Sequence, residues 1–560
     1  MTAASHQNAI PVGRRNRRPL GLWPSLAIVI AALVAVPIIT LLAQALHGSS
    51  DMLHHLATTV LPVALGNTVL LLVGVGILVA VIGTGTAWLV TAYEFPLRST
   101  VEWALLLPLA VPTYIIAYVY LDLLHPIGPV QSTLRMLLGY DSPRDFHLPD
   151  VRSKTGCILL LGFVLYPYVY AATRAMFMMQ AANFIDVSRT LGVSRTGVFW
   201  RVALPLARPA IAVGTSLALM ETLNDIGASE FLGVRTLTVS IYSTWVNSTD
   251  LPGAAMIALA LLVLTFALIN LERWARRHQR FSNTAQRNNR LVPRKLPKVT
   301  GALVLSVCLV PIVVGFVAPA CYLLVAAAQR IQFAGVSQKF MVVAFNTIAF
   351  AVIATILTLA MGTIVAYARR IRPGTLTKTC IRISTLGYAA PGTVIAIGVL
   401  IPLAGLDRFV DSCAKAWLGT STGLLLIGSG AALIYAYCVR FLAVSAGSVE
   451  TGLSRIPVSL DRASRSLGQS AIGTLFRVHL PLAKPAMAGA GLLLLVDCIK
   501  ELPATLLLRP LNFETLATQL YAEAARGTYE EGAIYALAIV TIGILPLIVL
   551  SRIGKRVAAI

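Results

Sequence analysis

DVSRTLGVSRTGVFWRVALPLARPA, residues 186–210, and RASRSLGQSAIGTLFRVHLPLAKPA, residues 462–486, are two copies of one segment. Aligned at an offset of 276 residues, they are identical at 14 of 25 positions. The shared positions include a serine, two arginines, a glycine and a Leu-Pro step, at Ser188/Ser464, Arg189/Arg465, Gly192/Gly468, Arg201/Arg477 and Leu204-Pro205/Leu480-Pro481. The chain therefore contains an internal repeat.

Each copy is polar and carries arginines, whereas the sequence on both sides of it is strongly apolar. Of the 560 residues, 57% are hydrophobic and only 12% are charged, and the mean hydropathy is +0.79. This composition is typical of integral membrane proteins and argues against a soluble core. We therefore expect both copies to leave the bilayer and to lie at its surface.

Runs of about 18 to 25 apolar residues are long enough to cross a bilayer as helices. The sequence contains twelve candidate runs, near residues 22–45, 67–93, 101–122, 156–180, 207–230, 254–272, 301–328, 346–369, 383–404, 422–443, 483–508 and 533–551. The first run is too long for the apolar region of a signal peptide, so we expect it to remain as a span.

The repeat extends beyond the two polar segments. Asn67-Thr68, Gly83-Thr84, Ala87 and Pro112 recur at an offset of 279 as Asn346-Thr347, Gly362-Thr363, Ala366 and Pro391. Since each unit has six spans, an even number, both copies enter the membrane from the same side and are related by an axis along the membrane normal. We predict a basic N-terminus (1–21), a first six-helix domain (22–272), a basic linker (273–300) and a second six-helix domain (301–560).

The distribution of basic residues predicts the orientation. A net charge of +22 suggests nucleic acid in a soluble protein, but here the basic residues lie in loops between spans, so we expect no nucleic-acid partner. Loop 47–64 contains no lysine or arginine. The segment 273–298 contains nine, Arg273, Arg276, Arg277, Arg280, Arg287, Arg290, Arg294, Lys295 and Lys298. By the positive-inside rule, the linker and both termini are cytoplasmic.

The sequence contains no phosphate-binding loop and no metalloprotease motif of its own. It contains no GxxxxGK[ST] phosphate loop and no HExxH. The seven cysteines are scattered, without CxxC spacing, and are typical of small core residues. We therefore expect neither ATP hydrolysis nor a bound cofactor in this chain.

The repeated segment resembles the coupling loop ("EAA" motif) of permease subunits of ATP-driven importers. The resemblance rests on the glycine, the nine residues that follow it, and an apolar residue two positions before Leu-Pro. It implies a short helix, a glycine turn and a second short helix stopped by proline, which receive force from a separate ATPase. It also implies an all-α fold with two tandem six-helix type I importer permease domains. The implied coupling residues are Asp186, Arg189, Gly192, Leu204, Pro205, Asp461, Arg465, Gly468, Leu480 and Pro481.

An alternative interpretation is an amphipathic helix that merely packs on lipid headgroups. The duplication and the Leu-Pro ending favour the coupling loop. The two copies also depart from the family pattern, since Asp186 replaces the usual glutamate and Arg462 stands at that position in the second copy, with Asp461 one residue earlier. We therefore expect the two loops to dock unequally on their ATPases.

Acidic residues follow each coupling loop, in METLNDIGASEFLG (220–233) and VDCIKELPATLLLRP (496–510). The 276 offset aligns Glu221 with Asp497 and Asp225 with Glu501, and in each half the two carboxylates share one face for as long as the helix lasts. Four unpaired carboxylates at mid-bilayer cost on the order of 10 kcal/mol, so we expect them to line a wet path. The predicted path residues are Glu221, Asn224, Asp225, Asp497, Lys500 and Glu501.

A structural role for these acids is the alternative. Asp497 can pair with Lys500 at i+3, and Glu221 and Asn224 can cap a helix break, so that the acids only brace the bundle. Gly227 and Pro503 are aligned and predict that both helices break or kink here. Broken spans occur where protein or water satisfies the exposed backbone.

Four acids disfavour an anionic cargo, and hard oxygen ligands suit a cation. The stretches ETLNDIG and FLGVRTLT (221–238) and KELPATLLLRPLNFETLAT (500–518) resemble ferric-iron permeases of bacterial importers. That resemblance implies a bacterial inner-membrane protein that receives Fe(III) from a periplasmic binding protein and is driven by two copies of a cytoplasmic ATPase, which hold the ATP and Mg²⁺. It also implies transient metal contact at Glu221, Asp225, Asp497 and Glu501.

Other functions remain open on the sequence alone. Thiamine and aminoethylphosphonate permeases share much of the pattern, and a polyamine is a further candidate cargo. An ion-coupled secondary transporter could use buried acids as proton sites, but it has no need of two coupling loops. The longest outer connection, 123–155, has no counterpart of equal length in the second half, and the sequence assigns it no role.

Overall fold

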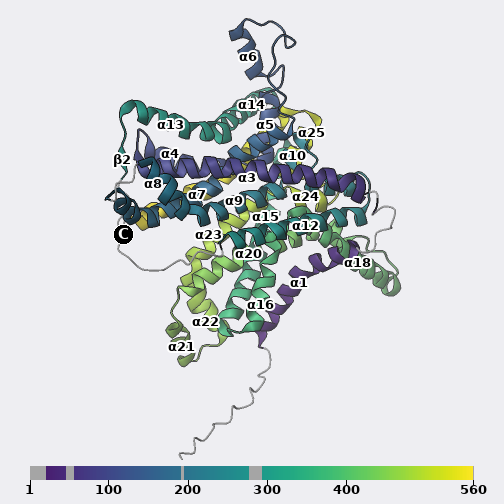
Figure 1. Ribbon diagram of the computed structural model, residues 1–560. Coiled ribbons are helices and arrows are strands. Elements are labelled where there is room, and N and C mark those ends of the chain that lie inside the picture. The colour runs from purple at the N-terminus through teal and green to yellow at the C-terminus, as the bar shows by residue number, and fades with distance from the viewer. Residues whose placement is uncertain (1–20, 46–53, 55, 191–194, 277–292, 559–560) are drawn as a thin grey trace, which may run out of the picture.

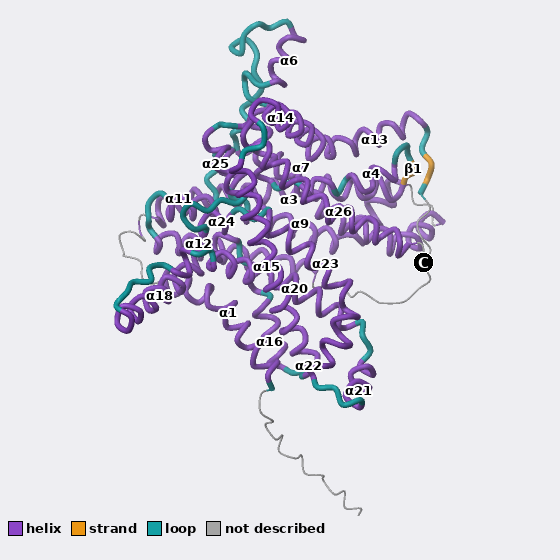
Figure 2. Tube along the Cα trace, turned by 180° about the vertical axis from the view of Figure 1, so that it is seen from behind, coloured by secondary structure: helices purple, strands orange, loops and turns teal. Residues whose placement is uncertain are grey.

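A computed structural model describes residues 21–45, 54, 56–190, 195–276 and 293–558 of the protein, and most of them are helical (Figures 1 and 2). Within this part of the chain, eleven helices are long and apolar enough to cross a membrane, and the number is twelve if one bent pair counts as a single span. The predicted all-α fold with tandem six-helix units is confirmed.

The first half of the sequence forms one set of helices. They are α1 (Leu22–Ala45), η1 (Leu56–Val60), α3 (Leu61–Ala92), α4 (Arg98–Ala104), η2 (Leu107–Ala110), α5 (Thr113–Leu123), α6 (Pro129–Leu138), α7 (Lys154–Thr190), α8 (Arg195–Val198), η3 (Phe199–Ala203), α9 (Leu204–Asn224), α10 (Gly227–Phe231), α11 (Leu237–Val246) and α12 (Leu251–Arg276). Helix α6, in loop 123–155, projects away from the bundle (Figure 1).

The second half repeats this series. It comprises α13 (Lys298–Ile312), η4 (Val313–Val317), α14 (Ala318–Ala334), α15 (Gln338–Ile371), α16 (Thr375–Ser384), α17 (Leu386–Ala389), α18 (Gly392–Leu418), α19 (Leu425–Gly428), α20 (Ala431–Ser454), α21 (Val458–Ser466), α22 (Ala471–Thr474), η5 (Leu475–His479), α23 (Leu480–Ile499), α24 (Pro503–Leu508), α25 (Leu516–Arg526) and α26 (Tyr529–Ala558). Two short strands, β1 (Tyr93–Glu94) and β2 (Arg294–Lys295), pair in parallel and join the end of the linker to the first half.

The repeated glycines lie where two helices touch through their backbones. A methyl group on Gly83 of α3 would lie 2.6 Å from Cβ of Val169 and 2.8 Å from the backbone nitrogen of Tyr170, both in α7. Gly362 of α15 approaches α20 at the equivalent place, where a methyl group would lie 2.8 Å from the backbone nitrogen of Ala446. This close approach explains why Gly83 and Gly362 recur at the offset of 279.

The alanine variant of Gly83 should therefore be destabilised. We expect Gly83→Ala to lower the free energy of unfolding by about 1–3 kcal/mol, because the new methyl group meets backbone atoms that cannot move aside. Gly85, two residues along the same helix, is the matched control, since a methyl group there meets nothing within 4 Å. Thermal unfolding of the purified variants measures the difference. Equal midpoints for Gly83→Ala and Gly85→Ala would contradict the proposed contact.

The first helix of each half packs on the other half. α1 lies against α15, α16 and α18 as well as α12, and the Thr40 hydroxyl donates to the carbonyl of Gly398 at 2.8 Å. In return, α13 and α14 lie against α4 and α5 of the first half as well as α26 of their own half, and the Tyr120 hydroxyl donates to the carbonyl of Val314 at 2.8 Å. The first helix of each predicted domain thus packs on the other domain. The boundaries of these domains remain a prediction.

Several predicted spans have other bounds in the structure. The third, expected to be continuous over 101–122, is bent by 92° between Ala110 and Thr113. The ninth begins at Gly392, directly after Pro391, and continues to Leu418. Proline explains both breaks, because Pro112 and Pro391 lack a backbone N–H and stand at the N-caps of α5 and α18. The fifth and eleventh end at Asn224 and Ile499, as Gly227 and Pro503 predict.

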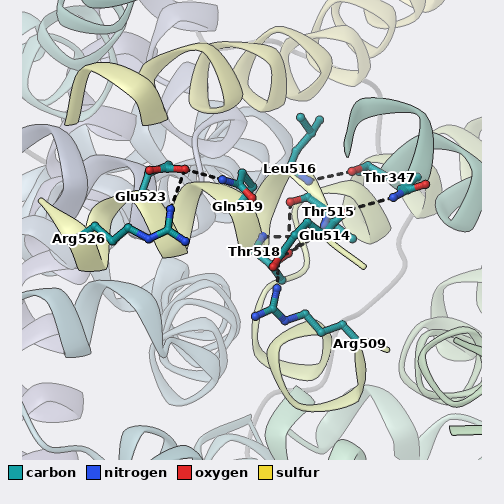
Figure 3. A network of polar contacts seen from close by, with 10 residues as sticks. Thr347, Arg509, Glu514, Thr515, Leu516, Thr518, Gln519, Glu523 and Arg526 are labelled. Atoms are coloured by element: carbon teal, nitrogen blue, oxygen red, sulfur yellow. Dashed lines mark hydrogen bonds and ion pairs between the residues drawn. The ribbon is translucent and has the colours of Figure 1, made fainter. Parts of the chain in front are cut away.

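The repeated Asn-Thr pair holds the loop that follows each broken span. In the first half, Asn67 donates to the carbonyl of Arg235 at 3.0 Å, and Thr68 accepts from the backbone nitrogen of Leu237 at 3.0 Å. In the second half, Asn346 donates to the carbonyl of Glu514 at 3.4 Å, and Thr347 accepts from the nitrogen of Leu516 at 2.8 Å (Figure 3). The same side chains thereby fix α11 and α25 to α3 and α15.

Candidate functional site

A cavity of about 170 Å³ lies at the centre of the molecule, between the two halves. Its wall includes residues of α5, α7, α9 and α10 of the first half and of α17, α20, α23 and α24 of the second, together with the segments that join α9 to α10 and α23 to α24. All six predicted path residues line it, namely Glu221, Asn224, Asp225, Asp497, Lys500 and Glu501. Residues that the repeat placed at equivalent positions thus meet in one space.

The carboxylate of Asp225 accepts hydrogen bonds at the break in the span. It stands at the C-cap of α9, so it does not share a helix face with Glu221, as a continuous helix would require. Its carboxylate accepts from the nitrogen of Ser229 at 2.8 Å, the hydroxyl of Ser229 at 2.9 Å and the hydroxyl of Thr113 at 2.6 Å. Asp225 therefore caps the short helix α10 with its carboxylate.

Glu501 does the same in the second half. Its carboxylate accepts from the backbone nitrogens of Ala504 at 2.9 Å and Thr505 at 3.0 Å, and so caps α24. It also pairs with Arg440 of α20, whose guanidinium lies 2.6 Å away. Both side chains are nearly enclosed, with 2% of the Glu501 and 13% of the Arg440 side chain exposed. For Asp225 and Glu501 the bracing alternative describes the observed contacts.

The other two acids face the cavity differently. Asp497 forms an ion pair with Lys500 at 3.0 Å, as the i+3 spacing suggested, and about 30% of each side chain is exposed. Glu221, in the last turn of α9, is half-buried in the wall. Among the described residues, no group lies within hydrogen-bonding or ion-pairing distance of its carboxylate. Glu221 is therefore the acid in this wall whose oxygens are free for another ligand.

Contacts across the cavity join the halves without following the pseudo-symmetry. The side-chain oxygen of Asn224 accepts from the backbone nitrogen of Gly392 at 2.8 Å. The Tyr114 hydroxyl donates to the carbonyl of Lys500 at 3.3 Å. Lys500 is the repeat equivalent of Asn224, so one half presents an amide where the other presents a cation. The wall is consequently asymmetric in charge.

The four carboxylates do not converge on one ion in this conformation. Within the described ranges, no group of three or more His, Cys, Asp or Glu side chains is arranged to hold a metal ion. The cavity holds four carboxylates and two cations, because Arg440 joins Lys500 there. Transient metal contact at Glu221, Asp225, Asp497 and Glu501 stays a prediction, with Glu221 the best placed.

Sequence reasoning missed Arg440 and Thr113. Arg440 was detectable, because it is the single charged residue between Lys415 and Glu450, inside a predicted span. A charge in a span is costly and marks a paired or functional site. Thr113 had no such signal, since its role depends on the break after Pro112 that brings its hydroxyl to Asp225.

The second copy of the repeated polar segment forms a compact elbow. Gly468 has a positive φ of 78°, a conformation that favours glycine, and it ends α21. Asp461 accepts from Arg370 of α15 at 3.0 Å and also bonds His479, which is buried. These contacts hold the elbow against the end of α15 that is cytoplasmic in the predicted topology. Arg465 is exposed and carries no such contact among the described residues.

The proline after the elbow does not stop a helix. Pro481 stands in the first turn of α23, and residues 471–499 run as one helical span with a π-helical turn at η5. Pro205 occupies the same place in α9, with Leu204 and Leu480 half-buried beside the two prolines. The expected proline stop is wrong, because a π-helical turn directly before each Leu-Pro step accommodates the missing N–H and the helix continues.

The first copy is described only in part. Its backbone is helical through Asp186 and Arg189 at the end of α7, but their side chains lie outside the described residues, as does Gly192. The aromatic residue before each Leu-Pro step is described in both copies. Trp200 and Phe476, aligned at the offset of 276, are 66% and 63% exposed.

Known proteins similar to this chain are permeases. Residues 73–280 match the family described as binding-protein-dependent transport system inner membrane component. The Fe(3+)-transport system permease protein FbpB 2 of Haemophilus influenzae is 22% identical over 543 residues, which are 96% of this chain and 99% of that protein. The putative 2-aminoethylphosphonate transport system permease protein PhnU of Salmonella choleraesuis is 28% identical over 46% of this chain and 93% of its own. The molybdenum transport system permease protein ModB of Escherichia coli K12 is 28% identical over 35% of this chain and 84% of its own.

Proposed function

Because this chain belongs to the binding-protein-dependent transport system inner membrane components and is a multi-pass permease of an ATP-driven importer, we propose that its cargo is Fe(III). The observation that carries the proposal is the cavity wall, where four carboxylates outnumber two basic side chains. Hard oxygen ligands and an excess of negative charge favour a hard cation over an anion. The similarity to FbpB 2 over nearly the whole chain supports the same cargo.

The carboxylates divide into two groups in this proposal. Asp225 and Glu501 cap α10 and α24 and keep the cavity wall in shape. Glu221 and Asp497 supply the transient contacts, since Glu221 has no hydrogen-bonding or ion-pairing partner in the described part of the chain and Asp497 can exchange Lys500 for a passing cation. The chain itself binds no cofactor. A periplasmic binding protein delivers the ion to this inner-membrane permease, whose termini are cytoplasmic.

Two copies of a cytoplasmic ATPase supply the energy by binding to the two coupling loops. The exposed apolar side chains there are suited to a protein contact, since Trp200 and Phe476 are more than half exposed at equivalent positions and Leu467 is 80% exposed. Nucleotide-driven closure of the ATPases then rotates the halves as rigid bodies. Asp461, tied to Arg370 and His479, passes this motion to α15 and α23.

A zwitterionic cargo such as 2-aminoethylphosphonate is the second candidate. The observation in its favour is that Lys500 and Arg440 line the same cavity as the acids, so both signs of charge are present. The similarity to PhnU over one half of the chain points the same way. Arg440 is already paired with Glu501 and Lys500 with Asp497, however, so a phosphonate would have to displace a carboxylate from one of these ion pairs.

Uptake by a deletion strain carrying the full operon tests the proposal. We expect accumulation of radiolabelled Fe(III), and no accumulation of thiamine, 2-aminoethylphosphonate or a polyamine. The tagged permease should also retain its ATPase on purification. Gly468→Val should reduce that retention and uptake together, because only glycine adopts a positive φ without strain. Gly489→Val, at a position with nothing within 4 Å and no positive φ, is the control. Normal iron uptake without this chain would exclude the assignment.

A further inference from the structure

The two halves meet at one end of the molecule and separate at the other. At one end, α10 of the first half lies against α25 of the second. At the opposite end, α8 and α22, which follow the glycines of the two repeated polar segments in the sequence, lie well apart (Figure 1). The predicted topology puts α10 and α25 on the outer side and the two repeated polar segments on the cytoplasmic side. What holds the outer end together therefore decides whether cargo can enter from outside.

Tyr521 of α25 makes that contact. Its ring stacks on Phe231 of α10, with centroids 5.3 Å apart and planes inclined by 25°. Its hydroxyl donates to the carboxylate of Glu230, the residue before Phe231. The Tyr521 side chain is buried, with 8% of the residue exposed. One residue of the second half thus engages both the polar and the aromatic side chain at the end of α10.

The contact lies on the pseudo-twofold axis. Tyr242 of α11 is the repeat equivalent of Tyr521, at the offset of 279, and the two rings meet edge to face with centroids 6.2 Å apart. Residues related by a twofold axis touch each other only where they lie on that axis. Glu230 has no such equivalent, because the matching helix α24 reads PATLLL and is apolar. The hydrogen bond from Tyr521 to Glu230 therefore has no counterpart related to it by the repeat.

Both partners are held rigidly. α10 is capped by Asp225, which accepts from Ser229 next to Glu230. α25 is fixed by Thr347, which accepts from Leu516, and by a capping box between Thr515 and Thr518 (Figure 3). Further along α25, Glu523 bonds Gln519 and Arg526 (Figure 3). Burial raises the pKa of the Glu230 carboxyl, and the hydrogen bond from Tyr521 lowers it. The bond thus offsets part of the cost of enclosing this acid.

We propose that Tyr521 and Glu230 form the latch that keeps the outer end of the cavity closed until the partner ATPases drive the halves apart there. The inference rests on the proposed function, because it assigns the gate of the same path. The latch is weak enough to open in each cycle, since it consists of the hydrogen bond to Glu230 and the ring contacts of Tyr521 with Phe231 and Tyr242. It is also specific, because the hydroxyl and the carboxylate come from different halves.

Access of a cysteine in the cavity wall tests the latch. Met220→Cys, which faces the cavity, is introduced with Cys321→Ser and Cys413→Ser, because these two are the described cysteines that are not buried. A membrane-impermeant thiol reagent is applied without ATP to spheroplasts, and separately to inverted vesicles. We expect labelling from the cytoplasmic face and little from outside. Tyr521→Phe should raise the outside rate about tenfold or more, the size expected for losing a hydrogen bond to a charged group.

Two variants serve as comparisons. Glu230→Gln keeps an acceptor but removes the charge, so its outside rate should rise less than that of Tyr521→Phe. Tyr120→Phe removes a hydroxyl that also bridges the halves but lies away from the axis, and its outside rate should equal that of the parent. Labelling from the cytoplasmic face should be the same in all variants, which verifies that they are folded.

The possible outcomes separate the two claims. An unchanged outside rate in Tyr521→Phe, with normal labelling from the cytoplasmic face, would overturn the latch and leave the transport path intact. A cavity cysteine that reacts from neither face in the parent would remove the cavity as a path, and the proposed function and the latch would fall together. A raised outside rate in Tyr521→Phe, smaller in Glu230→Gln, would support the latch.

Discussion

Uptake of Fe(III) is expected to fall to background when Glu221→Gln is combined with Asp497→Asn. Both changes keep the shape of the side chain and remove the charge that a passing cation would meet in the cavity. Losing two hydrogen-bonding contacts to a charged group costs about 3 kcal/mol or more, which corresponds to a loss of about a hundredfold. Radiotracer uptake in the deletion strain measures it, and co-purification of the ATPase verifies that the complex still assembles.

The single variants should be unequal. Glu221→Gln should cause the greater loss, because no described residue pairs with Glu221, whereas Asp497 is already neutralised by Lys500 at 3.0 Å. The double variant leaves Lys500 without its partner, so a third variant that adds Lys500→Met separates repulsion by this lysine from the loss of the acids. If the double variant takes up iron normally, the acids of the cavity wall do not serve the cargo.

Glu501→Leu is expected to destabilise the protein by about 3–5 kcal/mol, because it leaves Arg440 buried without its carboxylate. The leucine also cannot accept from the backbone nitrogens of Ala504 and Thr505, so α24 loses its cap. Thermal unfolding and the yield of protein in the membrane measure the effect. The buried position of both partners distinguishes this pair from the ion pairs at the surface.

Two comparisons isolate the cause. Glu501→Gln retains an acceptor for the cap and loses only the charge, so we expect an intermediate loss of stability. Asp497→Asn breaks a half-exposed ion pair in the same cavity, and such pairs contribute less than about 1 kcal/mol. If Glu501→Leu unfolds at the same temperature as Asp497→Asn, the Arg440 pair is not the brace described above.

The sequence predicted the repeat-related features best, because each of them depends on residues close together in the chain. Gly227 and Pro503 located the two helix breaks, and the aligned acids located the central cavity. The carboxylates of Asp225 and Glu501 were expected to face a path, but they cap α10 and α24. Counting acids could not reveal this, since a helix that breaks exposes backbone nitrogens that compete for the same oxygens.

Features that depend on contacts between elements far apart in the sequence were not predictable from periodicity. The Arg440–Glu501 pair joins two helices of the second half, and Tyr521 reaches Glu230 across the pseudo-twofold axis. The offset of 279 pairs Tyr242 with Tyr521, but a sequence alignment does not say that the two rings touch. The exchanged first helices left no signal either, because their apolar faces match lipid and protein equally well.

The exchange of first helices also restricts the order in which the protein can be made. α1 ends at Ala45, whereas the earliest of its partners in the second half, α15, begins at Gln338. During synthesis α1 leaves the ribosome long before that surface exists. Until α15 is inserted, α1 can therefore contact only lipid and the helices of the first half, such as α12. Both halves therefore mature together, and only after most of the chain has been inserted by the translocon.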